Sequence, residues 1–181
     1  MNIFKSLFGG NNSKDNNKES DKNKDFDILK DDGIRALHIN KVAYAIKCFE
    51  GALDIKDDVE TMELLANAYI AVNDHKGAIA VLEKESTLNP SEIKPLLSLA
   101  SVYFLEEEYA KMNDTCNRAI AIDDNDITAL YLNAKALVGL KDTIMAIAML
   151  TKAISIKDDY IDAYLLRAKT LYSMEQITNA K

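Results

Sequence analysis

The 181-residue chain contains no tryptophan and only two prolines and six glycines. Aromatic residues make up 7% of it, which is little for a β-sandwich, because sandwiches depend on aromatic and β-branched side chains. Proline and glycine are the residues that most often interrupt helices, so their scarcity permits long ones. Apolar residues make up 48% of the sequence, which is enough for the core of one ordinary domain.

Cysteine and histidine are equally scarce. Cys48 and Cys116 form no CxxC motif, and His38 and His75 are the only histidines, so too few ligands are available for a zinc site of the usual finger type. Two cysteines make no disulfide framework, which favours a reducing cytoplasm. We interpret both cysteines as small buried hydrophobic residues.

The acidic run at 123–126 is a stretch that suggests metal binding. A calcium-binding EF-hand loop needs a glycine at its sixth position and a glutamate at its twelfth. Counted from Asp123, these positions hold Thr128 and Ala134, so we interpret the run as a solvated turn. We therefore expect neither a metal nor a cofactor.

Positive charge is in deficit. The net charge is −7, and because residues 1–25 carry five lysines and four acidic residues, the remainder of the chain carries −8. An acidic chain argues against nucleic acid as a partner, since phosphate binding needs clustered lysines and arginines. No apolar run approaches the roughly 20 residues of a membrane span, and Met1–Phe8 is too short for the apolar segment of a signal peptide. The sequence thus predicts a soluble, cytoplasmic protein without stable membrane insertion.

The first 25 residues differ from the rest. Met1–Phe8 holds four large apolar residues that would lie near one face of a helix. It is either a frayed terminus, a short helix that docks on a partner, a membrane surface or the protein's own groove, or the remnant of a targeting signal. Asn11–Asp25 is entirely polar and has nothing to bury against the entropy of ordering, so we expect it to be disordered. The folded domain is expected to span residues 26–181.

From Phe26 onward the sequence repeats itself. Apolar residues recur at helical spacing, with short polar breaks about every fifteen residues, which predicts pairs of helices joined by tight turns. One column of small residues, suited to close helix crossings, has spacings of 33, 34, 34 and 34: Gly33, Ala66, Ala100, Ala134 and Ala168. Twelve and sixteen positions further on come two second-helix columns: Ala45, Ala78, Met112 and Ala146, then Phe49, Leu82, Cys116 and Leu150.

These columns resemble the signature of the tetratricopeptide-repeat family, W-x2-L-G-x2-Y…A-x3-F…P, over residues 26–181. The second repeat fits it best, with these residues in register: Leu65, Ala66, Tyr69, Ala78, Leu82 and Pro90. The resemblance implies an all-α fold, a right-handed α-solenoid whose helical hairpins stack and share a core. Four full repeats are expected at about 26–58, 59–92, 93–126 and 127–160. The partial repeat 161–181 either supplies a closing helix or belongs to a chain that was cut short.

The match to the family is incomplete in two columns. The leucine column keeps Leu65 and Leu99 but has Asp32, Asn133 and Arg167 in the other repeats, which predicts looser packing, or an edge, at those positions. The proline of the inter-repeat turn is present once, and the other such turns hold Asp57, Asp124 and Asp158. We expect these carboxylates to act in turns or near helix starts, where they accept free N–H groups.

The resemblance also implies a function. Proteins of this family act as non-catalytic scaffolds or adaptors, and a peptide or partner segment lies in the concave groove lined by the first helix of each repeat. The residues expected on this groove are Lys30, Leu64, Asn67, Leu97, Ser101, Phe104, Tyr131, Lys135, Leu166 and Lys169. Apolar members would supply most of the binding energy, and Asn67 would bond the ligand backbone.

Some members of the family grip the terminal carboxylate of a peptide with lysine, asparagine and arginine side chains from three successive repeats. Lys30 and Lys94 fit that pattern, whereas Ile34, Leu64 and Ser98 do not, so we expect no such clamp. The basic end of the first-helix column instead gives the hypothesis that an acidic peptide binds at Lys135 and Lys169.

Two other classes of function remain as alternatives. The open end near Ile161–Lys181 would let the protein stack on a second copy and act as a self-associating scaffold. An enzyme would need converging polar groups beyond those that the repeat accounts for, and we assign no catalytic residues. The expected partner is therefore a protein or a peptide.

Overall fold

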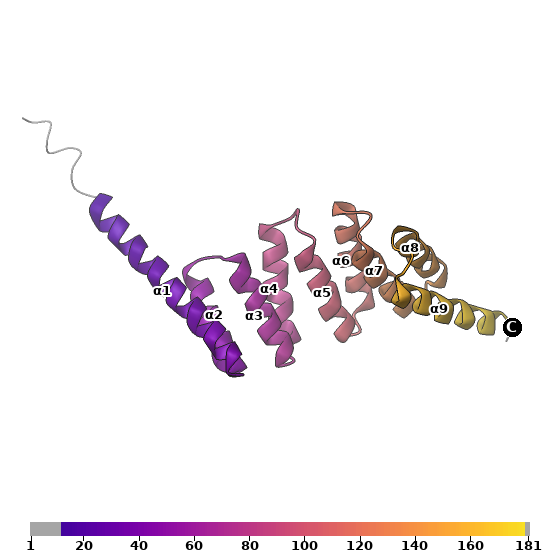
Figure 1. Ribbon diagram of the computed structural model, residues 1–181, viewed down its shortest axis with the longest axis horizontal. Helices are drawn as coiled ribbons and strands as arrows, with labels where there is room; N and C mark the ends of the chain where they lie inside the picture. Colours follow the sequence, from indigo (N-terminus) through magenta and orange to yellow (C-terminus); the bar gives the residue numbers. More distant parts are fainter. Residues whose placement is uncertain (1–11, 180–181) are drawn as a thin grey trace, which may run out of the picture. The chain divides into compact units, whose positions relative to one another are not determined.

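Every regular element of the computed structural model (Figure 1), which describes residues 12–179 and the side chains of residues 19–175, is an α-helix. Nine helices lie in this range, which confirms the predicted series of hairpins followed by one further helix. They are α1 (Asn12–His38), α2 (Val42–Ile55), α3 (Val59–Ala71), α4 (His75–Leu88), α5 (Lys94–Leu105), α6 (Tyr109–Ile122), α7 (Ile127–Gly139), α8 (Thr143–Ile156) and α9 (Ile161–Asn179).

The chain divides into two compact units. The first ends at Asp74 and contains α1, α2 and α3, and the second begins at His75 and contains α4 to α9. Within each unit, helices that follow one another in the sequence pack side by side, and α5 also packs on α7. The division falls between α3 and α4, inside the second predicted repeat, so the predicted repeat boundaries stay a prediction.

The start of α1 differs from the sequence-based expectation. Residues 12–25 were expected to be disordered with the rest of the polar tail, but they continue α1 toward the N-terminus. A helix already nucleated by packing gains one hydrogen bond for each added residue, so polar residues can extend it without burying anything. The described side chains of residues 19–25 are all exposed, and Phe26 is buried. Among the described side chains, burial thus begins at Phe26, whereas Met1–Phe8 lies outside the described residues.

The predicted columns form much of the core. Each member of the two second-helix columns is buried, and so are Ala66, Ala100 and Ala134 of the small-residue column. In the first unit, Gly33 of α1 lies so close to the buried ring of Phe49 on α2 that a Cβ atom at position 33 would collide with it. A small residue at the crossing thus lets the two helices of a hairpin approach closely.

Two polar residues of the leucine column, Asn133 and Arg167, bond to polar residues on the preceding helix. Asn133 of α7 is buried, and its Nδ2 donates hydrogen bonds to the Oδ1 atoms of Asn113 (3.0 Å) and Asn117 (3.1 Å) on α6. Arg167 of α9 donates to the Oγ1 of Thr151 on α8 (3.3 Å). At Asn133 the predicted looser packing is wrong, because hydrogen bonds replace the apolar contact and leave the side chain buried.

The helix boundaries are fixed by short-range chemistry. Asp58 and Asp126 are the N-caps of α3 and α7, and their carboxylates accept hydrogen bonds from the N–H groups of Thr61 (3.0 Å) and Ala129 (2.6 Å). Capping therefore falls on the carboxylates one or two residues after Asp57 and Asp124 of the predicted turns. Four turns within helix pairs each use one residue with a positive φ of 56–65°: Asn40, Asn73, Glu107 and Lys141.

Replacing each of the two helical glycines of the first unit by alanine should change the free energy of unfolding in opposite directions. Gly33→Ala should lower the free energy of unfolding by about 1–3 kcal/mol, because the new methyl group meets the buried ring of Phe49. Gly51→Ala in α2 should raise it by about 0.5–1 kcal/mol, because its Cβ would make an ordinary 3.4 Å contact with a methyl group of Leu29. Urea unfolding followed by circular dichroism measures both. Equal effects of the two substitutions would contradict the close crossing at Gly33.

Candidate functional site

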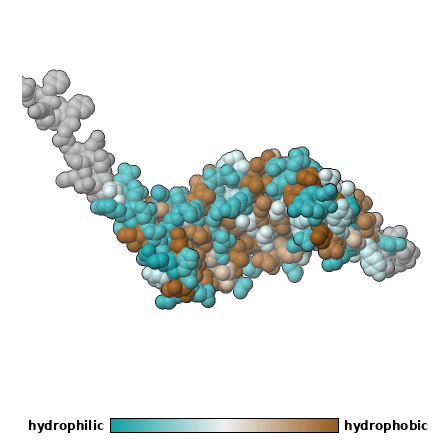
Figure 2. Space-filling view, viewed as in Figure 1, coloured by the Kyte–Doolittle hydropathy of each residue, from teal (hydrophilic) through white to brown (hydrophobic). Residues whose placement is uncertain are grey.

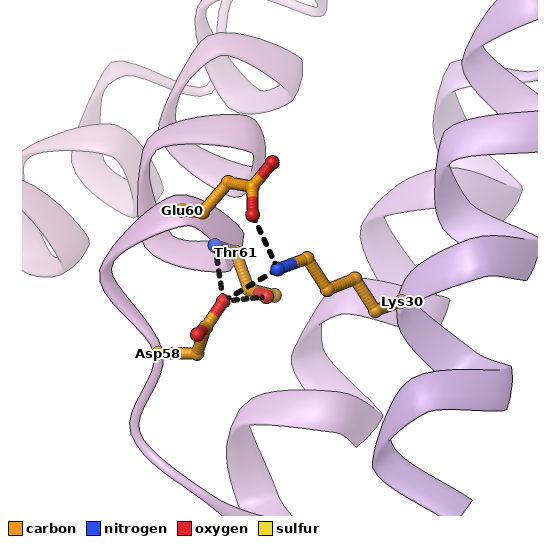
Figure 3. A network of polar contacts seen from close by, with 4 residues as sticks. All are labelled: Lys30, Asp58, Glu60 and Thr61. Atoms are coloured by element: carbon orange, nitrogen blue, oxygen red, sulfur yellow. Dashed lines mark hydrogen bonds and ion pairs between the residues drawn. The ribbon is translucent and has the colours of Figure 1, made fainter.

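Lys30 is the predicted groove residue of α1, and the structure places it in a polar network within the first unit (Figure 3). Its Nζ contacts the Oδ2 of Asp58 at 2.9 Å and the Oε2 of Glu60 at 2.6 Å, at the start of α3. The same Asp58 oxygen accepts hydrogen bonds from the N–H and the hydroxyl of Thr61. Lys30 therefore points its ammonium at the cap of α3.

Both charged groups of the network are favoured in their ionised forms at neutral pH. Burial by itself lowers the pKa of Lys30, but the hydrogen bonds and charges of Glu60 and Asp58 outweigh it, so the pKa is raised. Burial likewise raises the pKa of Asp58, and the bonds from Thr61 and Lys30 outweigh it, so that pKa is lowered. Only 17% of the Lys30 side chain is exposed. Because its charge is already paired, Lys30 serves to fix α1 against α3.

The other predicted residues of the first unit differ in exposure. Leu64 is half-buried and Asn67 is exposed, and both lie on α3. On the same helix, the hydroxyl of Tyr69 donates a hydrogen bond to the carboxylate of Glu50 on α2. This bond, like the Lys30 network, holds neighbouring helices together, so among these positions the exposed amide of Asn67 is the one open to a ligand.

In the second unit, the predicted residues of α5 lie along one side of the helix. Leu97 is half-buried and packs against a core cluster that includes Leu96 and Ala119. Ser101 is exposed, and its hydroxyl donates to the carbonyl of Leu97 at 2.9 Å. Phe104 is half-buried, and its ring meets the ring of Tyr109 edge-on at 6.3 Å.

Lys135 of α7 extends over this side of α5. Its Nζ lies 3.6 Å from the ring centroid of Phe104 and 5.8 Å from that of Tyr131. Burial lowers its pKa, because a partly desolvated ammonium favours the neutral form. Among the residues that the structure describes, no carboxylate lies within ion-pair distance of Lys135. The aromatic faces are thus the groups that compensate its charge.

Tyr160 joins this group from the turn before α9. Its ring centroid is 5.3 Å from that of Tyr131, and burial raises the pKa of both phenols. We call Phe104, Tyr131, Lys135 and Tyr160 the Lys135 cluster. Sequence reasoning missed Tyr160, although one signal was available: the equivalent positions 34 and 68 residues earlier hold Asp126 and Glu92, so an aromatic residue there is exceptional.

The two predicted residues of α9 differ in exposure. Leu166 is half-buried and packs with Tyr131 and Tyr160 against a core that includes Ala134 and Leu150. Lys169 is exposed. The structure thus brings Phe104, Tyr131, Lys135 and Leu166 together within the second unit. The arrangement offers one desolvated cation and several aromatic faces, which suits an anionic group attached to an apolar one.

The other candidate groups contribute no competing site. Cys48 and Cys116 are both buried, as predicted, and burial raises the pKa of Cys116 to about 12, which keeps its thiol protonated at neutral pH. His75 bonds to the carboxylate of Glu106. Within residues 12–179, no group of three or more histidine, cysteine, aspartate or glutamate side chains could hold a metal ion. None of the helices there is long and apolar enough to cross a membrane.

Many solved structures resemble this chain, among them the three that follow. YrrB, a TPR protein, has 20% identity and a TM-score of 0.65, covering 76% of this chain and 70% of its own. The first TPR of Spaghetti (RPAP3) has 18% identity and a TM-score of 0.62, covering 65% and 93%. The chain has the tetratricopeptide-repeat fold. MamA from Desulfovibrio magneticus RS-1 has 17% identity and a TM-score of 0.75, covering 86% and 89%.

Sequence comparison is less sensitive than structure here. No protein-family model matches the chain, and no curated protein matches it either. The tetratricopeptide repeat is defined by a few small and large apolar positions per 34 residues, so two chains can share the fold while differing at most others. The likeness to the solved structures accordingly concerns the fold.

The Lys30 network should be measurable in unfolding experiments. Lys30→Met should lower the free energy of unfolding by about 1 kcal/mol at pH 7, because it leaves Asp58 and Glu60 without their cation. Lys24→Met is the control. Lys24 makes an exposed pair with Asp21 at 3.9 Å, and its loss should change stability by less than about 0.5 kcal/mol.

The pH dependence follows from the direction of the two pKa shifts. Asp58 has a lowered pKa, so its contribution is present above its unfolded pKa of about 3.9 and is lost as the pH falls through the lower folded value. Lys30 has a raised pKa, so its contribution persists until the pH rises through that value. The cost of Lys30→Met should therefore be constant from about pH 5 to 9 and shrink below about pH 4. A cost that grew on acidification would show that the pair does not stabilise α3.

Proposed function

We propose that this protein is a non-catalytic interaction module that binds an acidic peptide segment across α5 and α7, with Lys135 contacting a ligand carboxylate. The observation that carries the proposal is the state of Lys135. Its ammonium is partly desolvated over Phe104 and has no carboxylate partner among the described residues. A ligand carboxylate would restore the lost solvation with a charge-assisted hydrogen bond.

The contrast with Lys30 supports this assignment. Both lysines were predicted on the groove, but Lys30 is held by two carboxylates of its own unit. The ammonium of Lys135 instead lies over two aromatic rings, with no carboxylate partner among the described side chains. A lysine that is already paired gains little from a further anion, since its charge is compensated. The acidic-peptide hypothesis, first framed on Lys135 and Lys169, therefore rests on Lys135.

The surroundings of Lys135 fit a peptide better than a free anion. Phe104, Tyr131 and Tyr160 present half-buried aromatic surface beside the ammonium, and aromatic residues are enriched at protein-interaction surfaces. The first TPR of Spaghetti (RPAP3) was solved bound to the HSP90 peptide SRMEEVD, and YrrB is described as having an unusual peptide-binding site. We extend peptide binding to this chain on the basis of the fold and the Lys135 cluster.

The proposal also includes further ligand contacts and a role of the protein as a scaffold. Leu97, Ser101, Leu166 and Lys169 would contact the ligand beside the Lys135 cluster, and the predicted cytoplasmic location would give access to protein partners. The repeat columns account for the buried apolar residues, which supports a scaffold rather than an enzyme. Leu64 and Asn67 lie on the first unit, and their part in binding stays a proposal.

Binding of an acidic probe should depend on Lys135. Fluorescence polarisation with labelled SRMEEVD should show an affinity that falls about tenfold in Lys135→Met, the loss of one charge-assisted hydrogen bond of about 1.5 kcal/mol. The control is Lys111→Met. Lys111 also lies near an aromatic ring, 5.7 Å from Tyr103, but pairs with Glu108 at 3.5 Å, so its loss should leave the affinity unchanged.

A neutral peptide distinguishes the contribution of the ligand's charge to binding from the contribution of its shape. The amidated peptide SRMQQVN should bind the native chain about tenfold more weakly than SRMEEVD, and Lys135→Met should not weaken that binding further. Lack of binding of either peptide at millimolar concentration would contradict the proposal. So would equal affinity of the native chain and Lys135→Met for SRMEEVD.

A further inference from the structure

Several lysines of this protein have their ammonium held by a carboxylate. The Nζ of Lys30 contacts two carboxylate oxygens, at 2.9 and 2.6 Å. The Nζ of Lys111 lies 3.5 Å from the carboxylate of Glu108, and that of Lys152 lies 3.2 Å from the carboxylate of Asp124. A carboxylate at such a distance stabilises the protonated amine, and its negative charge repels an approaching anion.

Lys135 has different surroundings. Its Nζ lies 3.6 Å from the ring centroid of Phe104, and no carboxylate of the described side chains lies at ion-pair distance from it. The side chain is half-buried, so the amine is partly desolvated and can still be reached from solvent. Burial lowers the pKa of Lys135, which raises the fraction of neutral amine at a given pH. A neutral lysine amine is a nucleophile, whereas the protonated amine has no free electron pair.

We infer that Lys135 is a site of acylation by an acyl phosphate, and that the acyl group abolishes the anion contact of the Lys135 cluster. The modification itself does not depend on the proposed function, whereas its effect on binding rests on the proposed peptide site. Acylation removes the charge of a lysine. A ligand carboxylate would then face a neutral amide in place of an ammonium.

The reaction transfers one acyl group to Lys135. The free electron pair of Nζ attacks the carbonyl carbon of the acyl phosphate, and a C–N bond forms. The C–O bond to the phosphate breaks, and inorganic phosphate leaves with the electron pair of that bond. The proton displaced from Nζ passes to solvent. The step needs no oxidant, reductant or further reactant.

The class of the acyl donor follows from charge. An acyl phosphate is an anion, so the carboxylates beside Lys30, Lys111 and Lys152 oppose its approach. Lys135 has no such group at ion-pair distance among the described side chains. The ring of Phe104 beside Nζ also offers an apolar surface on which a small acyl group can pack. The lysine that best accepts a ligand anion is therefore also the one best placed to react with an anionic acyl donor.

The fold should tolerate the acyl group on Lys135. Acylation ends the contact between the cation and the ring of Phe104, but it also removes a charge that burial disfavours, and the two effects offset each other. At Lys30 the same modification would leave Asp58 and Glu60 without their cation. Lys135 can thus lose its charge while the helices stay in place.

Mass spectrometry of the full chain tests the modification in the absence of peptide. The protein is incubated with acetyl phosphate at about pH 8, where an ordinary lysine is almost fully protonated, and the acetylation of each lysine is followed with time. Lys135 should react faster than Lys111 and Lys169 by about threefold or more. Lys111 also lies near a ring, 5.7 Å from Tyr103, but is paired with Glu108, and Lys169 is exposed. A smaller excess over either control, or none, would overturn the inference.

Two substitutions test the effect of the acyl group on binding. Lys135→Gln, which resembles the acetylated side chain, should bind labelled SRMEEVD about tenfold more weakly than the native chain, and so should the native chain after treatment with acetyl phosphate. Lys135→Arg keeps the charge and accepts no acyl group, so treatment should leave its affinity unchanged. Equal losses of affinity in treated Lys135→Arg and in the treated native chain would show that other lysines cause the loss, and would refute the effect on binding.

The two measurements keep this inference apart from the proposed function. Equal affinity of the native chain and Lys135→Met for SRMEEVD would refute the peptide site and the effect of acylation on it. The acetylation rates are measured without peptide, so they decide on the modification of Lys135 in either case.

Discussion

The close crossing of paired helices at a small side chain is the constraint on which the rest of this structure depends. Two helices can bury a continuous apolar surface only if their backbones approach, and a large residue at the crossing holds them apart. Gly33 lies directly against Phe49, and Ala100 and Ala134 occupy fully buried positions. Because the backbones approach so closely, large apolar residues pack on either side of the crossing, and polar residues remain at the surface. On the side that Figure 2 shows, brown apolar surface lies interspersed with teal polar surface.

Polar contacts add specificity to this apolar framework. The tyrosine that stands three residues after the small residue bonds to a glutamate of the preceding helix in each unit. Tyr69 bonds to Glu50, and Tyr103 bonds to Glu83 at 3.0 Å. At Asn133 of the leucine column, the side-chain amide donates hydrogen bonds to the Oδ1 atoms of two asparagines on α6. Such bonds contribute little net free energy, but a buried amide without partners would be costly. They therefore fix which helix faces fit together.

Two lysines predicted on the same groove have different contacts in the structure. Lys30 and Lys135 both stand on first helices, and from the sequence they are equivalent basic groups on the expected groove. Lys30 meets Asp58 and Glu60 because these residues begin α3 within its reach. Lys135 meets Phe104, from the preceding first helix, and has lost part of its hydration there. The sequence could predict that Phe104, Tyr131 and Lys135 lie on one kind of surface. Helical periodicity could not place Tyr160 beside them, because Tyr160 lies in a turn, and its only signal in the sequence was an aromatic residue where the earlier repeats have Asp126 and Glu92.

The sequence by itself determined the all-helical repeat architecture, the buried columns and the position where packing begins, because each depends on local periodicity and on the size of residues at fixed spacing. Only the tertiary structure decided which carboxylates cap the helices and which lysine is paired. Those outcomes depend on distances between side chains from different helices, which no single stretch of sequence specifies.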